Sequence, residues 1–283
     1  MKFIIFISIL LSTASTQGAT RVMTFNTTCS HLCEKGNYDS YEKRKYWIVD
    51  TVKRNNPDLV AFQEVFLPSQ LKWFKKKLKD YTLIYHRKFF FFRYADPALF
   101  IKTSKYKVRR YGGFWLGPLG YWFSFGWKMG LPRRVQWARV QERDTGREFY
   151  FTSSHFDNRS KNKTNSAKVF TKAFRNVTAP IIFAGDTNLR PHMEGYQIMN
   201  ENFHDSFDIK ENFELVKNSE TTIHDSCNIE KATVFPECRV DHIFLSKAHK
   251  WQVFNWGVDQ FKYGTKNRFT SDHRAIFADI EFE

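Results

Sequence analysis

Short runs of apolar or alternating residues recur along the chain, separated by polar turn residues, and this pattern is typical of β-strands. The runs predict strands over residues 21–26, 59–63, 82–86, 98–102, 135–142, 148–154, 181–185, 240–245 and 275–281. Asp144-Thr145-Gly146 lies between two of these runs and predicts a hairpin that joins 135–142 to 148–154.

Three segments between the strands have the apolar spacing of amphipathic helices. They are residues 41–54, 69–80 and 164–176, with apolar stripes formed by Ile48, Val49 and Val52, by Leu71, Phe74 and Leu78, and by Ala167, Phe170 and Phe174. Ser69 can cap the second helix. Strands that outnumber helices, with the helices placed between them, predict a layered α/β or α+β domain whose helical apolar residues are core.

The first residues have the layout of a secretory signal peptide. Lys2 precedes an apolar stretch over residues 3–11, and small and polar residues follow up to Ala19. The stretch is too short to span a bilayer, which favours a cleaved signal peptide over residues 1–19 rather than a retained anchor. We therefore expect a secreted or periplasmic protein with one domain over residues 20–283, where we find no linker, internal repeat or further transmembrane segment.

Composition adds a strong positive charge to this picture. Lys and Arg total 44 against 29 Asp and Glu, a formal net charge of +15. Such an excess attracts polyanions, so nucleic acid and anionic membrane surfaces are both expected partners. The alternative is a basic surface that only keeps the protein soluble. The lysines of helix 69–80 could likewise contact phosphates or simply form a solvated helix face.

Four cysteines in an exported chain predict two disulfides. We favour local pairing, with Cys29 bonded to Cys33 and Cys227 bonded to Cys238, although three pairings are possible. The spacings Cys-x₃-Cys and Cys-x₁₀-Cys match a zinc site poorly.

Polar side chains stand beside apolar strands at six places. They are Asn26, Glu64, His155 with Asp157, Asp186 with Asn188, Asp241 with His242, and Asp272 with His273. Each one alone has an ordinary structural explanation, such as a loop acid, a turn or a core histidine. Buried polar groups cost free energy unless they are paired or bound to a metal, so six of them together indicate a site built from strand ends.

The ordered set resembles the endonuclease/exonuclease/phosphatase superfamily, which includes deoxyribonuclease I, neutral sphingomyelinases and inositol phosphatases. The matching elements, spread between residues 23 and 276, are Thr-Phe-Asn26, Gln-Glu64, Ser-His155-Phe-Asp, Gly-Asp186-Thr-Asn188, Val-Asp241-His-Ile-Phe and Ser-Asp272-His273. The stretch from Phe114 to Arg139 also resembles exported bacterial members. The resemblance implies an α/β fold, a four-layer α/β/β/α sandwich of two mixed β-sheets with the site at one edge.

The resemblance also implies roles for the site residues. Asn26 and Glu64 would bind a divalent metal, Asp186 and Asn188 would position water and phosphoryl oxygens, His155 would contact a phosphoryl oxygen, and Asp241 would complete the site. His273, oriented by Asp272, would activate the water or steady the phosphate. Carboxylate and amide oxygens suit Mg²⁺, with Mn²⁺ as the alternative. The chain has no P-loop, so the sequence does not support ATP-dependent phosphoryl transfer. Because every element of the ordered set of site residues is present, a purely binding protein on this fold is disfavoured.

The substrate is less well defined than the chemistry. A nuclease is favoured by the positive charge, with substrate contacts expected at Arg133, Arg139 and Asn158 and in the run 87–94. The rivals are a small-molecule phosphatase and a sphingomyelinase-like phospholipase. The aromatic segment 111–129 supports the phospholipase because its rings could enter a membrane interface, unless they fold over the protein's own core.

Overall fold

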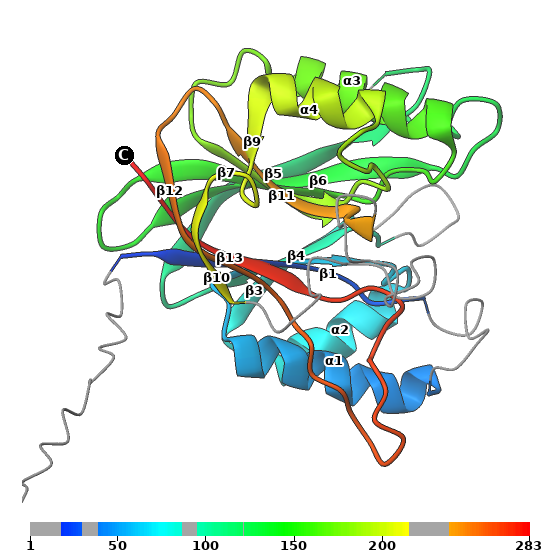
Figure 1. Cartoon of the computed structure of the whole chain (residues 1–283), viewed down its shortest axis with the longest axis vertical. Helices are drawn as coiled ribbons and strands as arrows, with labels where there is room; N and C mark the ends of the chain where they lie inside the picture. The colour runs from blue at the N-terminus through cyan, green and yellow to red at the C-terminus, as the bar shows by residue number, and fades with distance from the viewer. Residues whose placement is uncertain (1–17, 30–38, 87–94, 121, 215–237) are drawn as a thin grey trace, which may run out of the picture.

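The computed structural model describes residues 18–29, 39–86, 95–120, 122–214 and 238–283. Two β-sheets lie face to face and helices cover both outer faces (Figure 1), which confirms the predicted four-layer sandwich of two mixed sheets. The proposed signal peptide lies almost wholly outside the described residues. Within the described part of the chain, no helix is long and apolar enough to cross a membrane.

The first sheet is built from β1 (Thr20–Asn26), β2 (Leu59–Gln63), β3 (Tyr81–Ile84), β4 (Ala98–Lys102), β10 (Lys210–Glu214), β12 (Trp251–Val258) and β13 (Ile276–Phe282). Its order is β10-β12-β13-β1-β2-β4-β3. Helices α1 (Tyr41–Asn55) and α2 (Pro68–Lys77) cover its outer face, where Ile48, Val52 and Phe74 are fully buried. Its central strands β1 and β2 are buried on both faces, which explains their nearly continuous apolar sequences.

The second sheet is built from β5 (Tyr106–Leu116), β6 (Arg133–Glu142), β7 (Glu148–Ser154), β8 (Ile181–Asp186), β9 (Phe203–Asp205) and β11 (Asp241–Ser246). Its order is β5-β6-β7-β8-β11-β9. Helices α3 (Ser160–Phe174) and α4 (Glu194–Asn202) pack on its outer face around Phe170 and Met199. The inner faces of the two sheets meet in a core that includes Val22, Phe151 and Trp256.

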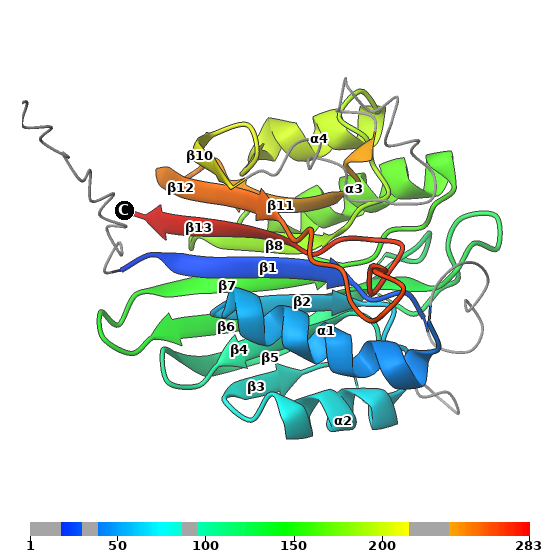
Figure 2. The same cartoon turned by 60° about the horizontal axis from the view of Figure 1, so that its bottom comes forward.

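The strand directions bring the polar strand ends together. Strands β1 and β2 run parallel, and so do β7 and β8, so the carboxyl ends of each pair lie at one edge of a sheet. Strand β11 runs antiparallel to β8 with Asp241 opposite Asp186, and β13 runs antiparallel to β1. Their first residues therefore lie at the same end of the molecule as the last residues of β1 and β8 (Figure 2).

Every strand and helix expected from the sequence is present, with bounds that differ by at most a few residues. The hairpin between β6 and β7 is confirmed. The capping role of Ser69 is wrong: Leu67 is the N-cap of α2, Pro68 follows it as the first helical residue, and Gln70 accepts a hydrogen bond from the Leu67 N–H. Strands β5, β9, β10 and β12 and helix α4 were not expected.

Cys29 and Cys238 are both disulfide-bonded. Cys33 and Cys227 lie outside the described residues, and the pairing of Cys29 with Cys33 and of Cys227 with Cys238 stays a prediction.

Candidate active site

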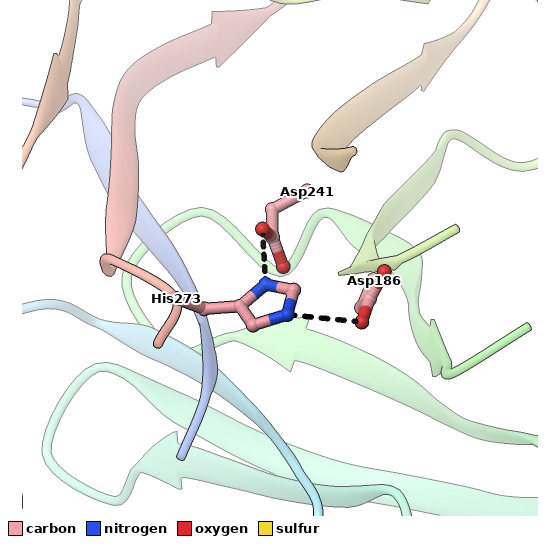
Figure 3. Close-up of side chains that lie close together, drawn as sticks. All are labelled: Asp186, Asp241 and His273. Carbon is pink, nitrogen blue, oxygen red and sulfur yellow. Dashed lines mark hydrogen bonds and ion pairs between the residues drawn. The ribbon is translucent and has the colours of Figure 1, made fainter. Parts of the chain in front are cut away.

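Asp186, Asp241 and His273 meet where the two sheets face each other (Figure 3). Nδ1 of His273 lies 2.8 Å from Oδ2 of Asp241, and Nε2 lies 3.8 Å from Oδ2 of Asp186. Burial opposes protonation of the imidazole, but the two carboxylates outweigh it and raise the pKa of His273 well above its ordinary value. The two carboxylates therefore favour the protonated form of the His273 ring.

Asp186 is the centre of the cluster and is fully buried at the end of β8. Nε2 of His155 lies 3.3 Å from its Oδ2, and the Asn26 amide donates to the same oxygen at 3.0 Å. Burial opposes ionisation, but the electrostatic interactions with His155 and His273 and the hydrogen bond from Asn26 lower the pKa of Asp186. The Asp186 carboxylate therefore lies among donors that can also contact an anionic substrate.

Glu64 joins the cluster through Asn26. The Asn26 amide donates to Oε1 of Glu64 at 3.1 Å, so one nitrogen bridges the carboxylates of Glu64 and Asp186. The Cys29 N–H donates to Oε2 of Glu64 at 2.7 Å. Glu64 has a left-handed backbone with φ of 66°, which turns its side chain from the end of β2 toward this cluster.

Asn188 lies just beyond Asp186 and closes the turn after β8. Its N–H donates to Oδ1 of Asp186 at 2.8 Å, and its side-chain amide donates to the Phe156 carbonyl at 3.0 Å. Asn188 also has a positive φ, of 52°. The residue therefore shapes the loop around Asp186 and lies half-buried beside it.

The expected pairing of His273 with Asp272 is wrong. The Asp272 carboxylate accepts hydrogen bonds from the hydroxyls of Thr28 and Ser271, whereas Asp241 holds the His273 ring. Asp241 reaches this position because its strand pairs with β8, a long-range contact that the sequence does not reveal.

The residues expected to contact substrate are dispersed. Arg133 is buried near the cluster, with Nη1 3.7 Å from Oδ2 of Asp96. Arg139 lies six residues further along β6, roughly 20 Å away at the usual rise of a strand, and forms an ion pair with Glu148 at 2.6 Å. Its expected place at the site is therefore wrong. Asn158 is exposed in the loop after β7.

Two basic segments, helix α2 and the run 87–94, are further candidates for substrate contacts. The lysines at 72, 76, 77 and 79 are exposed around helix α2, consistent with a solvated surface. The run 87–94 lies outside the described residues.

Two residues of the site were missed by the sequence argument. Asp96 accepts a hydrogen bond from the Glu64 N–H at 2.8 Å, and Nδ1 of His155 lies 3.7 Å from its Oδ2. The available signal was its place two residues before the apolar strand β4. Arg44 is buried in α1, where its neighbours in sequence read as an ordinary charged helix face.

Arg44 connects the two ends of the chain at the site. Its guanidinium donates to the backbone carbonyls of Asp39, Thr27, Thr28, Cys29 and Thr270. The first four carbonyls lie in the segment that leads from β1 to α1, and the fifth lies three residues before His273. One side chain therefore fixes the segment after Asn26 against the segment that carries His273.

The donor set fits a divalent metal. Asp186, Asp241 and His273 offer ligand atoms within 4.8 Å of one another, and Asn26 places Glu64 next to Asp186. Carboxylate oxygens supplemented by an amide or imidazole are the ligands that such ions take in hydrolytic sites. The carboxylates of the cluster can thus hold a metal, and His155 and His273 lie beside Asp186, where they could donate to an anionic substrate.

Comparison with known proteins agrees with this arrangement. Residues 23–273 match the model of the Endonuclease/Exonuclease/phosphatase family. No curated protein sequence matches the chain.

Several solved structures are similar in fold. An endonuclease/exonuclease/phosphatase family protein from Bacteroides thetaiotaomicron is 25% identical with a TM-score of 0.77, covering 93% of this chain and 97% of its own. A mannosyl-6-phosphatase from the same organism is 25% identical with a TM-score of 0.76, covering 93% and 99%. D. rerio TDP2, complexed with a single-strand DNA product, is 20% identical with a TM-score of 0.70, covering 93% and 99%.

Proposed function

The chain belongs to the endonuclease/exonuclease/phosphatase family and is a metal-dependent phosphoesterase, and from this premise we propose that it is a Mg²⁺-dependent nuclease. The observation that carries the chemistry is the buried series Asp241–His273–Asp186, joined through Asn26 to Glu64. Nucleic acid is its proposed partner, and DNA and RNA are both candidate substrates.

Each residue has a part in phosphodiester hydrolysis that follows from its contacts. Glu64 and Asp186, whose carboxylates converge on the Asn26 amide, would hold the metal, which would supply charge stabilisation to a bound phosphoryl group. Asp186 accepts a proton or hydrogen bond from the attacking water. His273, kept protonated by Asp241, donates to a phosphoryl oxygen through Nε2, and His155 donates from the other side of Asp186.

The proposal of a polynucleotide substrate is supported by charge. The net charge of +15 favours capture of a polyanion, and phosphate contacts dominate nucleic-acid affinity. Arg133 stands beside the cluster as the nearest arginine expected to contact substrate. The TDP2 structure with a single-strand DNA product has the same fold.

The test is a hydrolysis assay of the purified protein with Mg²⁺, with Mn²⁺ and with EDTA. The substrates are plasmid DNA, single-stranded DNA, RNA, sphingomyelin vesicles and a sugar 6-phosphate. Metal-dependent cleavage of a polynucleotide, lost in Asp186→Asn, supports the proposal. Cleavage of the sugar phosphate or of the lipid with intact polynucleotides refutes the nuclease assignment.

A second candidate is a phospholipase that acts at membranes. The observation that favours it is a set of exposed apolar side chains next to the site, including Trp122 and Met129 at 80% and 74% exposure. Such side chains can enter the apolar part of a membrane interface, which a lipid substrate would bring to the enzyme. The lipid arm of the assay decides between the two substrates.

Export is proposed from the N-terminal sequence. We propose that residues 1–19 are removed and that the protein is secreted or periplasmic. Sequencing the amino terminus of protein from the culture medium or periplasm should give Thr20 as the first residue. An uncleaved protein in the cytosolic fraction would contradict export.

A further inference from the structure

The loop between β5 and β6, residues 117–132, exposes an unusual apolar surface. Among the described residues, more than half of the exposed large hydrophobic side chains lie in this loop. They are Leu119, Trp122, Phe125, Met129 and Leu131, with exposures of 63%, 80%, 47%, 74% and 58%. We call these five residues the apolar loop surface. Soluble proteins rarely gather exposed apolar groups unless the surface docks on something.

The loop is held from its inner side. Phe123 packs against Trp115 with ring centroids 5.0 Å apart, and Gly126 and Gly130 exchange two backbone hydrogen bonds of 3.1 Å. A Cβ at Gly130 would lie 2.2 Å from Nδ2 of Asn162 and 2.3 Å from Oδ2 of Asp157, so the neck of the loop lies directly on those two side chains. The inner aromatic residues thus belong to the protein's own packing, while the apolar loop surface does not.

The loop leaves and rejoins its sheet at the same edge as the active site. It begins after Leu116 and ends at Arg133, whose guanidinium lies 3.7 Å from Asp96. His155 lies 3.7 Å from the same carboxylate. The C-terminal end of the loop is therefore linked to His155 through Asp96.

The charged residues around the apolar loop surface indicate what kind of partner it binds. Lys128 is the only charged residue of the loop, and the Arg159 guanidinium donates to its backbone carbonyl at 3.0 Å. Lys161 is exposed in the first turn of α3, and the sequence has no Asp or Glu between residues 97 and 141. An apolar tip with a cationic rim complements an anionic lipid surface. Two copies of the loop would instead bring like charges together.

We propose that the apolar loop surface docks on a bilayer that contains anionic phospholipid. Trp122, Phe125 and Met129 enter the interface, where amphipathic rings and long apolar chains are favoured, and Lys128 stays at the head groups. In the docked enzyme, the active site faces the membrane. This property is independent of which phosphoester the enzyme cleaves.

The test measures co-sedimentation with vesicles of phosphatidylcholine alone and with one quarter phosphatidylserine. We expect the wild type to bind the anionic vesicles and Trp122→Ser/Met129→Ser to bind them at least about tenfold more weakly, because buried apolar area sets interfacial affinity. Lys128→Glu should weaken binding to the anionic vesicles only. Tyr46→Ser is the matched control, since Tyr46 is 54% exposed on α1.

Hydrolysis of bis(p-nitrophenyl) phosphate, a soluble diester, keeps this test separate from the proposed function. The double variant should hydrolyse it at the wild-type rate, which shows that the site is folded. Absence of wild-type binding to anionic vesicles, or equal loss in Tyr46→Ser, overturns the proposal. So does a wild-type dimer in solution that Trp122→Ser dissociates, because the occupant would then be a second copy of the chain.

Discussion

Replacing Asp241 with Asn tests how His273 is held. In the structure Oδ2 of Asp241 lies 2.8 Å from Nδ1 of His273, and both side chains are buried. The amide has almost the same shape as the carboxylate but carries no charge. The substitution therefore removes the attraction that raises the pKa of His273 and leaves the packing nearly intact.

The size of the effect follows from the contact. A hydrogen bond to a charged group contributes about 1.5–3 kcal/mol, and two unit charges at 4 Å attract by about 4 kcal/mol at an effective dielectric constant near 20. These values correspond to roughly 10- to 1,000-fold in rate if the interaction is needed in the transition state. We expect kcat of Asp241→Asn to fall by about 100-fold. The alkaline limb of its pH profile should move to lower pH, because the imidazolium loses the charge that stabilises it.

The assay compares kcat from pH 5 to 10 on a soluble phosphodiester, with thermal unfolding as a check on folding. Asp272→Asn is the matched control because Asp272 is the next acid in sequence but bonds Thr28 and Ser271. It should lose much less kcat than Asp241→Asn, because Asp272 does not contact the His273 ring. Near wild-type kcat in Asp241→Asn together with a large loss in Asp272→Asn would refute the pairing described here.

Three further predictions concern the metal, the loop neck and a second buried network. Glu64→Gln should need about 10- to 100-fold more Mg²⁺ for half-maximal activity, and EDTA should abolish wild-type activity reversibly; an unchanged Mg²⁺ titration would count against Glu64 as a ligand. Gly130→Ala should lose about 1–3 kcal/mol of stability and several degrees of Tm in calorimetry, because its Cβ would lie 2.2 Å from Asn162, and a Tm within one degree of wild type would contradict this. Burial opposes ionisation of Asp205, but the attraction of Arg239 and His242 outweighs burial and lowers the pKa of Asp205. The ionised carboxylate therefore stabilises the fold above the unfolded pKa of about 4, and this stabilisation is lost as the pH falls through the folded pKa. Asp205→Asn should therefore lower the free energy of unfolding in urea by about 3–5 kcal/mol at pH 7. The difference in this free energy between variant and wild type should become smaller below about pH 4. A difference that does not change with pH would show that ionisation of Asp205 does not stabilise the fold.

The strands were predictable where a buried face dictated their sequence. Strands β2 and β8 are buried along their whole lengths and β1 at every residue except Arg21, and their apolar runs lead into polar residues that the site uses. Strand β5 was missed because it is a sheet edge with exposed Lys107, Arg109 and Arg110 and a Gly-Gly pair in its middle. Helix α4 was missed because its start is polar and its buried face is short.

The site was predictable as a set of residue types and less so as a set of pairs. Strand ends gather at one edge, so Asn26, Asp186 and His273 come together as expected. Which acid touches His273 depends on the register of β11 against β8, and register is a long-range property. Arg139 was misplaced for a similar reason, because distance along an extended strand grows by about 3.3 Å per residue.

Because Arg44 ties two segments of the site together, hydrogen exchange of the backbone amides in these segments should report on the opening of the whole site. Its guanidinium ties carbonyls on both sides of the cluster to helix α1, so neither segment can open without exposing a buried cation and several unpaired acceptors. The segment after β1 and the segment before β13, nearly the full chain apart in sequence, should thus open in one cooperative unit. Deuterium uptake at Thr28 and His273 should then follow the same free energy of opening, although no strand joins the two residues.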